Sequence, residues 1–337
     1  MNTRFLRDLE VSEIGMGCMG FSHGYGKVPD EAYALQAVRK AYDFGCIFFD
    51  TAEGYGKEMF YPGHNEELLG KALASFRKNV VLATKFHISQ TEIQENMVLY
   101  DFIRSHLENS MKRLKTDYID LYYLHRLNES VPVEEVAEVM GRLIQEGVIR
   151  GWGLSQVSAD TLRKAHEVTP VSAVQNIYSM VERDCEKEIF PYCLENRIGV
   201  VPFSPIASGL LSGKVTTETK FEGDDVRKFV PQLSRENIVG NQPILDVLAE
   251  FANRKSASSA QISLAWMLHK YPNVVPIPGS KNQERILENL GAWNVELTES
   301  EFLELETALD SCTVYGHRGH VESEQRTFSN NWIKSRI

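Results

Sequence analysis

The sequence lacks the marks of several common classes of protein. It holds only five cysteines, and no two of them form a CxxC pair, so neither a disulfide framework nor a metal site is expected. No run approaches the ~18 apolar residues of a membrane-spanning helix. Residues 1–8 carry no apolar core of a signal peptide. These absences predict a cytoplasmic protein with no membrane partner.

Positive charge is also scarce. Lys and Arg number 36 against 46 Asp and Glu, which gives a net charge of -10. No basic run offsets this excess, and an acidic chain repels phosphate backbones, so nucleic acid is not an expected partner. Hydrophobic residues at 43% and charged residues at 24% are ordinary for a globular protein, which excludes disordered, collagen-like and coiled-coil chains.

What the sequence does contain is a regular alternation of short apolar runs with longer amphipathic stretches. The apolar runs are rich in Val, Ile, Tyr and Phe, as buried parallel strands are. Eight strands alternating with eight helices predict an α/β fold of the (β/α)8 type, the TIM barrel. The predicted strands are 14–19, 46–50, 80–86, 118–125, 148–154, 173–176, 198–203 and 274–277. The predicted helices are 31–44, 64–76, 99–114, 133–146, 159–168, 185–196, 260–270 and 283–291.

The length of 337 residues alone would suggest two domains. No linker, repeat or low-complexity segment divides the chain, so we expect one barrel domain over 1–337, with its core in 3–310. Residues 311–337 are expected to form a tail near the mouth of the active site. The surplus over a minimal barrel is assigned to an N-terminal hairpin, a long loop and two added helices, at 3–12, 207–242, 243–253 and 299–310.

Glycines raise a rival fold and mark several predicted turns. Residues 15–20 read GMGCMG and match GxGxxG, the phosphate-binding turn of doubly wound sheets. No strand precedes this match, so we interpret its glycines as positions of close packing within the first barrel strand. Gly45, Gly147 and Gly199 stand where helices should end and are expected to supply a left-handed cap.

In a barrel of this type, active sites form at the carboxyl ends of the strands. Asp50, Lys85 and His125 end three successive predicted strands, and Tyr55 follows the first of them between two glycines. We expect Asp50 to pair with Lys85, and the ammonium of Lys85 to lower the pKa of Tyr55 from ~10. Tyr55 could then donate a proton to a carbonyl oxygen that His125 orients. Each residue alone has a structural interpretation, but their combination favours catalysis.

The remaining strand ends are polar as well. Ser155, Gln156 and Gln175 offer donors and acceptors for a primary amide, and Phe203 offers a flat face for an aromatic ring. The glycine- and serine-rich loop that follows Phe203 can approach a pyrophosphate with backbone N–H groups. Lys281 and Arg285 stand at the start of a predicted helix, where a phosphate is favoured, although a solvated helix face would also explain them.

The order and spacing of these motifs resemble those of the aldo-keto reductases over residues 3–310. The resemblance implies that Asp50, Tyr55, Lys85 and His125 form a catalytic tetrad, with Tyr55 as general acid. The matching segments are FDTAEGYG at 49–56, TK at 84–85, LHR at 124–126, GLS at 153–155, QNIYS at 175–179 and PGSK at 278–281.

The resemblance further implies an extended NADP(H) whose nicotinamide lies at the barrel mouth. Gln156 replaces a common Asn, and Phe203 a frequent Tyr or Trp, but each keeps the chemistry needed. The implied contacts are Ser155, Gln156 and Gln175 to the carboxamide; Phe203 to the nicotinamide ring; Ser204, Ile206, Ser208, Gly209 and Leu210 to the pyrophosphate; Ser280, Lys281 and Arg285, with Gly279 in the same loop, to the 2′-phosphate; and Glu288 and Asn289 to the adenine.

The implied reaction is the reduction of aldehydes or ketones to alcohols by hydride from NADPH, with a small carbonyl compound as the substrate. Two alternatives are kept. One is an NADP(H)-binding regulatory subunit of a larger complex with only slow reductase activity. The other is an aldolase in which Lys85 forms a Schiff base. Residues 21–27, 86–96 and 126–131, the loop after Phe203 and the tail are expected to select the substrate.

Overall fold

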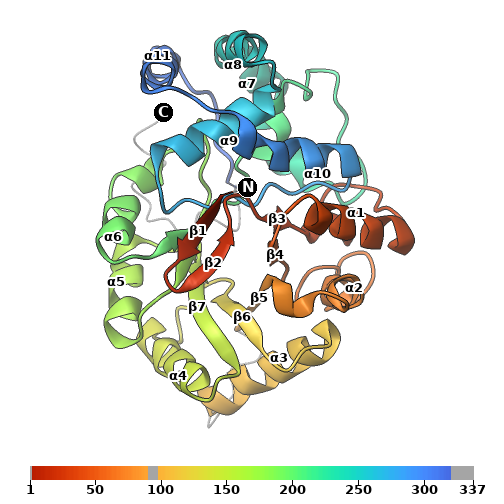
Figure 1. Cartoon of the computed structure of the whole chain (residues 1–337), viewed down its shortest axis with the longest axis vertical. Helices are drawn as coiled ribbons and strands as arrows, with labels where there is room; N and C mark the ends of the chain where they lie inside the picture. The colour runs from red at the N-terminus through yellow and green to blue at the C-terminus, as the bar shows by residue number, and fades with distance from the viewer. Residues whose placement is uncertain (1, 90–97, 320–337) are drawn as a thin grey trace.

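The computed structural model of the chain describes residues 2–89 and 98–319. Its centre is a curled sheet of parallel strands in the order β3-β4-β5-β6-β7-β8-β9, which follows the chain. Helices surround the sheet on its outer side (Figure 1). This arrangement confirms the predicted (β/α)8 fold. The strands are β3 (Met16–Gly17), β4 (Phe48–Asp50), β5 (Val81–Phe86), β6 (Ile119–Leu124), β7 (Ile149–Ser155), β8 (Ala173–Gln175) and β9 (Gly199–Val200).

The eighth predicted strand closes the barrel without forming a regular strand. The segment 274–279 bridges to Val200 of β9 on one side and to Gly17 of β3 on the other. Pro276 and Pro278 lie within this segment and have no backbone N–H to donate. On the β9 side, Val275 and Ile277 still donate to the carbonyl oxygens of Val200 and Pro202. A continuous hydrogen-bond ladder on both sides would need the donors that the two prolines lack.

Each predicted barrel helix is present, with ends that agree to within a few residues. The largest difference lies at 185–196, where a 3-10 turn (η3, Asp184–Glu186) precedes a shorter helix. The buried faces of the barrel helices pack on the sheet and form the main hydrophobic core. The helices are α1 (Glu31–Asp43), α2 (His64–Leu73), α3 (Leu99–Leu114), α4 (Val133–Gln145), α5 (Ala159–Val168), α6 (Ile189–Glu195), α9 (Ser259–Lys270) and α10 (Gln283–Leu290).

The predicted N-terminal hairpin is also confirmed. Strands β1 (Thr3–Leu6) and β2 (Leu9–Ser12) pair antiparallel and lie across one end of the barrel (Figure 1). Leu6 and Val11 are fully buried in a second core, together with inward-facing strand residues such as Tyr123. This end of the barrel is therefore filled by apolar side chains.

The glycine predictions are confirmed in part. Gly45 and Gly147 have φ of 115° and 74°, as helix-ending glycines should. Gly199 does not have this conformation, and the left-handed residue after α6 is Arg197 instead. Gly199 lies in β9 and packs directly against Leu6 of the hairpin, so the absence of a side chain there serves close packing.

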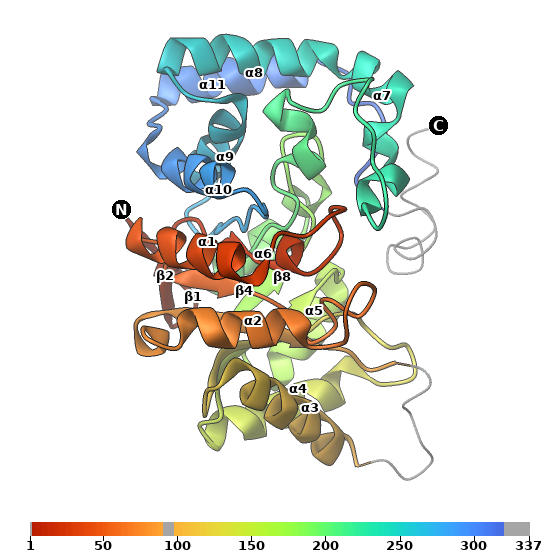
Figure 2. The same ribbon diagram turned by 90° about the vertical axis from the view of Figure 1, so that its right-hand side faces the viewer.

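In the described part of the chain, three further helices lie outside the barrel. Helices α7 (Arg235–Gly240) and α8 (Gln242–Lys255) follow the seventh strand, and α11 (Glu299–Asp310) follows α10. Helices α8 and α11 lie side by side in Figure 2. The rest of the predicted loop 207–242 contains short 3-10 turns: η4 (Ala207–Ser212), η5 (Val226–Phe229) and η6 (Pro231–Leu233). Among residues 2–89 and 98–319, no helix combines the length and apolar character needed to cross a membrane.

Candidate active site

The predicted tetrad lies at the carboxyl ends of neighbouring parallel strands. Because β4, β5 and β6 are paired in register, their ends meet at one edge of the sheet and bring Asp50, Lys85 and His125 together. The Lys85 Nζ donates to Asp50 Oδ1 at 2.5 Å, to the Thr51 carbonyl oxygen at 2.7 Å and to the Tyr55 hydroxyl at 3.3 Å. Lys85 is fully buried, so three protein oxygens replace its water.

Tyr55 and His125 lie next to each other above this lysine. Their ring centroids are 5.7 Å apart, and the rings meet edge to face at 79°. Tyr55 is carried by the loop after β4, where its carbonyl oxygen accepts the backbone N–H of Asn65 at 3.3 Å. Both rings line one cavity, so a carbonyl oxygen placed between them could meet both groups.

The charges of these groups follow from their burial and their partners. Burial raises the pKa of Tyr55 above its ordinary value, and the opposing effect of Lys85 is smaller, so the expected fall in pKa was wrong. Burial also opposes the charge of Lys85, but its contacts with Asp50 and Tyr55 outweigh this effect and raise its pKa. Burial, with Arg126 and Lys85 nearby, lowers the pKa of His125 well below its usual range. At neutral pH the site therefore holds a phenol, an ammonium and a neutral imidazole.

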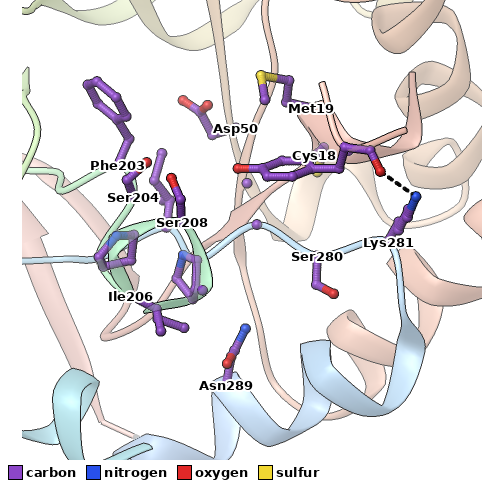
Figure 3. Close-up of a pocket in the computed structure, with 18 of the residues that line it drawn as sticks. Cys18, Met19, Asp50, Phe203, Ser204, Ile206, Ser208, Ser280, Lys281 and Asn289 are labelled. Atoms are coloured by element: carbon purple, nitrogen blue, oxygen red, sulfur yellow. Dashed lines mark hydrogen bonds between the residues drawn. The ribbon is translucent and has the colours of Figure 1, made fainter. Parts of the chain in front are cut away.

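One continuous cavity of about 340 Å³ extends from the tetrad over the strand ends. Figure 3 shows Asp50 and Phe203 at one end of it and Lys281 and Asn289 at the other. Lys85 lies behind this wall. The predicted cofactor residues that line the cavity are Ser155, Gln175, Phe203, Ser204, Ile206, Ser208, Gly209, Gly279, Ser280, Lys281, Arg285, Glu288 and Asn289.

Two predicted cofactor residues do not line it. Leu210 is fully buried in the main hydrophobic core. Gln156 lies behind the cavity wall, where its Oε1 accepts the Ile177 backbone N–H at 2.8 Å. Its neighbour Gln175 does face the cavity and donates to Asp50 Oδ2 at 2.8 Å. Gln175 therefore also holds the carboxylate that pairs with the tetrad lysine.

The loop after Phe203 has an unusual backbone. Ser204, Ala207 and Ser208 adopt positive φ values of 53°, 47° and 55°, which side chains disfavour, and Gly209 follows at 100°. Such conformations concentrate at ligand-binding loops. The Ser208 hydroxyl is buried without a hydrogen-bond partner among the described residues. A buried donor facing a cavity fits an anionic oxygen, and this loop therefore suits the pyrophosphate of a dinucleotide.

The far end of the cavity carries the predicted phosphate-binding cations. Lys281 Nζ donates to the carbonyl oxygens of Tyr25 and Lys27 at 2.6 and 2.5 Å, and Figure 3 marks one of these bonds. An ammonium has three N–H bonds, so one remains for a ligand. Arg285 is exposed in the first turn of α10, whose N-cap Asn282 accepts the Arg285 backbone N–H at 2.8 Å. A helix N-terminus with two cations fits a phosphate group.

The sequence analysis named the segments of three further arginines of the cavity wall as substrate-selecting, but it did not single out these arginines. Arg126 donates to the carbonyl oxygen of His125 at 2.6 Å and to Ser155 Oγ at 3.0 Å. Arg227 and Arg318 also line the cavity. The position of Arg126 next to His125 was a usable signal. The other two arginines come from segments without hydrophobic periodicity, where no pattern indicates which side chains point inward.

The comparisons with known proteins agree with this geometry. The model of the aldo/keto reductase family matches residues 13–323. The chain belongs to this family. It is 37% identical over 312 residues to a probable aldo-keto reductase of Glycine max, covering 92% of this chain and 88% of that one. Members of the family are NADP-dependent oxidoreductases, and the chain is an enzyme of this class.

Solved structures of this family have the same fold. A glycerol dehydrogenase from Gluconobacter oxydans is 26% identical, with a TM-score of 0.80 over 92% of this chain and 95% of that one. An aldo/keto reductase from Klebsiella pneumoniae in complex with NADP and acetate is 26% identical, with a TM-score of 0.71 over 94% and 98% of the two chains.

Proposed function

We propose that the protein reduces aldehydes or ketones to alcohols with NADPH as the hydride donor and Tyr55 as the general acid. The observation that carries this proposal is the contact at 3.3 Å between the Tyr55 hydroxyl and the buried ammonium of Lys85, in a cavity that His125 also lines. Family membership and the NADP complex of the Klebsiella pneumoniae relative support the cofactor.

Each residue of the tetrad has a role that its surroundings support. Tyr55 stays protonated at neutral pH because its pKa is raised, so it can donate to the carbonyl oxygen. Lys85 stabilises the phenolate that forms as the proton leaves, and Asp50 holds Lys85 in place at 2.5 Å. His125 is neutral and can donate one hydrogen bond that orients the same oxygen.

Bound NADPH supplies the hydride. Ser155 and Gln175 would hold the carboxamide, with Gln156 behind them, and Phe203 would stack on the nicotinamide ring. Holding the cofactor and the substrate in one cavity accounts for much of the rate enhancement through proximity. Farther along, the pyrophosphate would meet Ser204, Ile206, Ser208 and Gly209, the 2′-phosphate would meet Gly279, Ser280, Lys281 and Arg285, and the adenine would meet Glu288 and Asn289. Leu210, which is buried in the core, would support the pyrophosphate loop from behind.

The alternatives have less support. No finding above supports a regulatory subunit, and the tetrad geometry suits catalysis. An aldolase would need Lys85 as a nucleophile that reaches its substrate. Lys85 is instead fully buried, bonded to three oxygens and absent from the residues that line the cavity. We also propose that the chain forms one barrel domain over 1–337, with its core in 3–310 and its tail near the mouth of the active site.

The test combines a panel of aldehydes and ketones with a conservative variant. NADPH and NADH oxidation are followed in parallel for the wild type, Tyr55→Phe and Tyr100→Phe, whose hydroxyl lies outside the cavity on α3. We expect Tyr55→Phe to lose about a hundred- to ten-thousandfold in kcat while it keeps its affinity for NADPH. Tyr100→Phe should match the wild type. Wild-type turnover in Tyr55→Phe would overturn the mechanism.

A further inference from the structure

A buried arginine near the C-terminus lies in the wall of the cavity and has no role in the proposed reaction. Arg318 exposes only 6% of its surface. Its Nε donates to Ser204 Oγ at 2.8 Å, next to Phe203. Its Nη1 is buried without a hydrogen-bond partner among the described residues. The guanidinium is thus held by a neutral hydroxyl and retains an unused donor.

The backbone is held at Arg318 and at Tyr315, three residues before it. Asn241 donates to the Tyr315 carbonyl oxygen at 2.9 Å and accepts the Tyr315 N–H at 3.0 Å. The backbone N–H of Arg318 donates to the carboxylate of Glu182, in the loop after β8, at 2.9 Å. These contacts attach the C-terminal segment across the mouth of the barrel, so the arginine is positioned in advance of ligand binding.

The energetics indicate what is missing at this position. A buried cation loses its hydration, and a hydroxyl oxygen does not compensate for that loss as an anion does. A guanidinium presents parallel N–H donors that match the two oxygens of a carboxylate. The Glu182 carboxylate that accepts the Arg318 backbone N–H adds negative charge close to this residue, so a singly charged ligand group is favoured over a doubly charged one. The site around Arg318 therefore fits a carboxylate group of a ligand.

The place of Arg318 along the cavity favours the substrate over the cofactor. The cations proposed for the 2′-phosphate of the cofactor are Lys281 and Arg285, at the far end of the cavity. Arg318 contacts Ser204, the first residue of the proposed pyrophosphate loop, which directly follows Phe203. Because Phe203 is the residue proposed to stack on the nicotinamide, Arg318 lies at the end of this loop that is nearer the proposed reaction. Resting on the proposed function, we propose that Arg318 binds a carboxylate of the carbonyl substrate, so the enzyme prefers aldehydes or ketones that carry one.

The test compares two aldehydes that share their reactive group, para-carboxybenzaldehyde and its methyl ester. The readout is the ratio of kcat/KM for the acid to that for the ester. We expect the wild type to favour the acid and Arg318→Gln to lower the ratio about ten- to a hundredfold, the range for one hydrogen bond to a charged group, mostly through KM. Arg318→Lys should restore part of the ratio because it keeps the charge. Arg235→Gln, an exposed arginine on α7 outside the cavity, should leave the ratio unchanged.

Other outcomes overturn the proposal. A wild type without preference, or an unchanged ratio in Arg318→Gln, excludes a carboxylate site. A fluorescence titration with NADPH tests whether Arg318 contacts the cofactor rather than the substrate. We expect the Kd for NADPH to change less than about threefold in Arg318→Gln. A rise in this Kd of about tenfold or more would assign Arg318 to the cofactor instead. A wild type that binds NADPH but reduces no carbonyl compound would contradict the proposed function itself, which is a different result.

Discussion

The two ends of the cavity are built in different ways. At the tetrad end, Asp50 and Lys85 lie at the ends of the adjacent strands β4 and β5. Both are almost fully buried, and the Lys85 ammonium donates a hydrogen bond to the Asp50 carboxylate. At the phosphate end, defined here by Ser208, Gly209, Lys281 and Arg285, the chain forms loops with left-handed residues, and Arg285 is exposed. Strands hold reacting groups in fixed positions, whereas loops bring backbone N–H groups and cations to a long ligand. The two ends should therefore respond differently to substitution.

The largest effect is expected at the tetrad end, from Lys85→Met. This change leaves Asp50 buried without its cation, which should lower the free energy of unfolding by about 3–5 kcal/mol. It also removes the group proposed to stabilise the Tyr55 phenolate, and kcat should fall by about a hundredfold or more. Urea unfolding and steady-state kinetics measure the two losses. A stable Lys85→Met enzyme with normal kcat would show that the two ends do not differ in this way.

At the phosphate end, Lys281→Met should give a smaller and more selective loss. We expect the Kd for NADPH to rise about ten- to a hundredfold because one charge-assisted contact is lost, while the Kd for NADH, which has no 2′-phosphate, stays nearly constant. Isothermal titration with both cofactors checks this. Lys164→Met on the exposed side of α5 is the matched control. Equal losses for NADPH and NADH would assign Lys281 to another part of the cofactor.

The smallest effect concerns pH and stability. Because the folded pKa of His125 lies below its unfolded value near 6.5, the unfolded chain binds more protons as the pH falls. The contribution of neutral His125 to the free energy of unfolding is fully present above about pH 6.5. It is lost as the pH falls toward the folded pKa, by at most about 1.4 kcal/mol per pH unit. The stability difference between the wild type and His125→Gln should shrink accordingly in urea unfolding. Arg285→Gln removes a permanent charge at the other end, so its curve should run parallel to that of the wild type.

The same contrast explains which residues could be predicted. Asp50, Lys85 and His125 each end an apolar run, and parallel strands necessarily bring their carboxyl ends to one edge. The segment that carries Arg318 is held at the cavity by contacts of Tyr315 with Asn241 and of Arg318 with Glu182, which both lie far away in the sequence. No period or motif in its own segment could indicate that. Residues 320–337 of the tail expected near the mouth, and residues 90–96 of the expected substrate loop at 86–96, lie outside the described residues.

The sequence by itself determined the order of strands and helices, the hairpin and the strand-end positions of the tetrad, because these depend on local patterns of apolar and polar residues. Tertiary structure decided what depends on burial and on distant contacts. The pKa of Tyr55 rises because desolvation exceeds the effect of Lys85, although the adjacent cation alone predicted a fall. Gly199 serves packing against the hairpin rather than a turn. Both outcomes follow from neighbours that only the folded chain brings close.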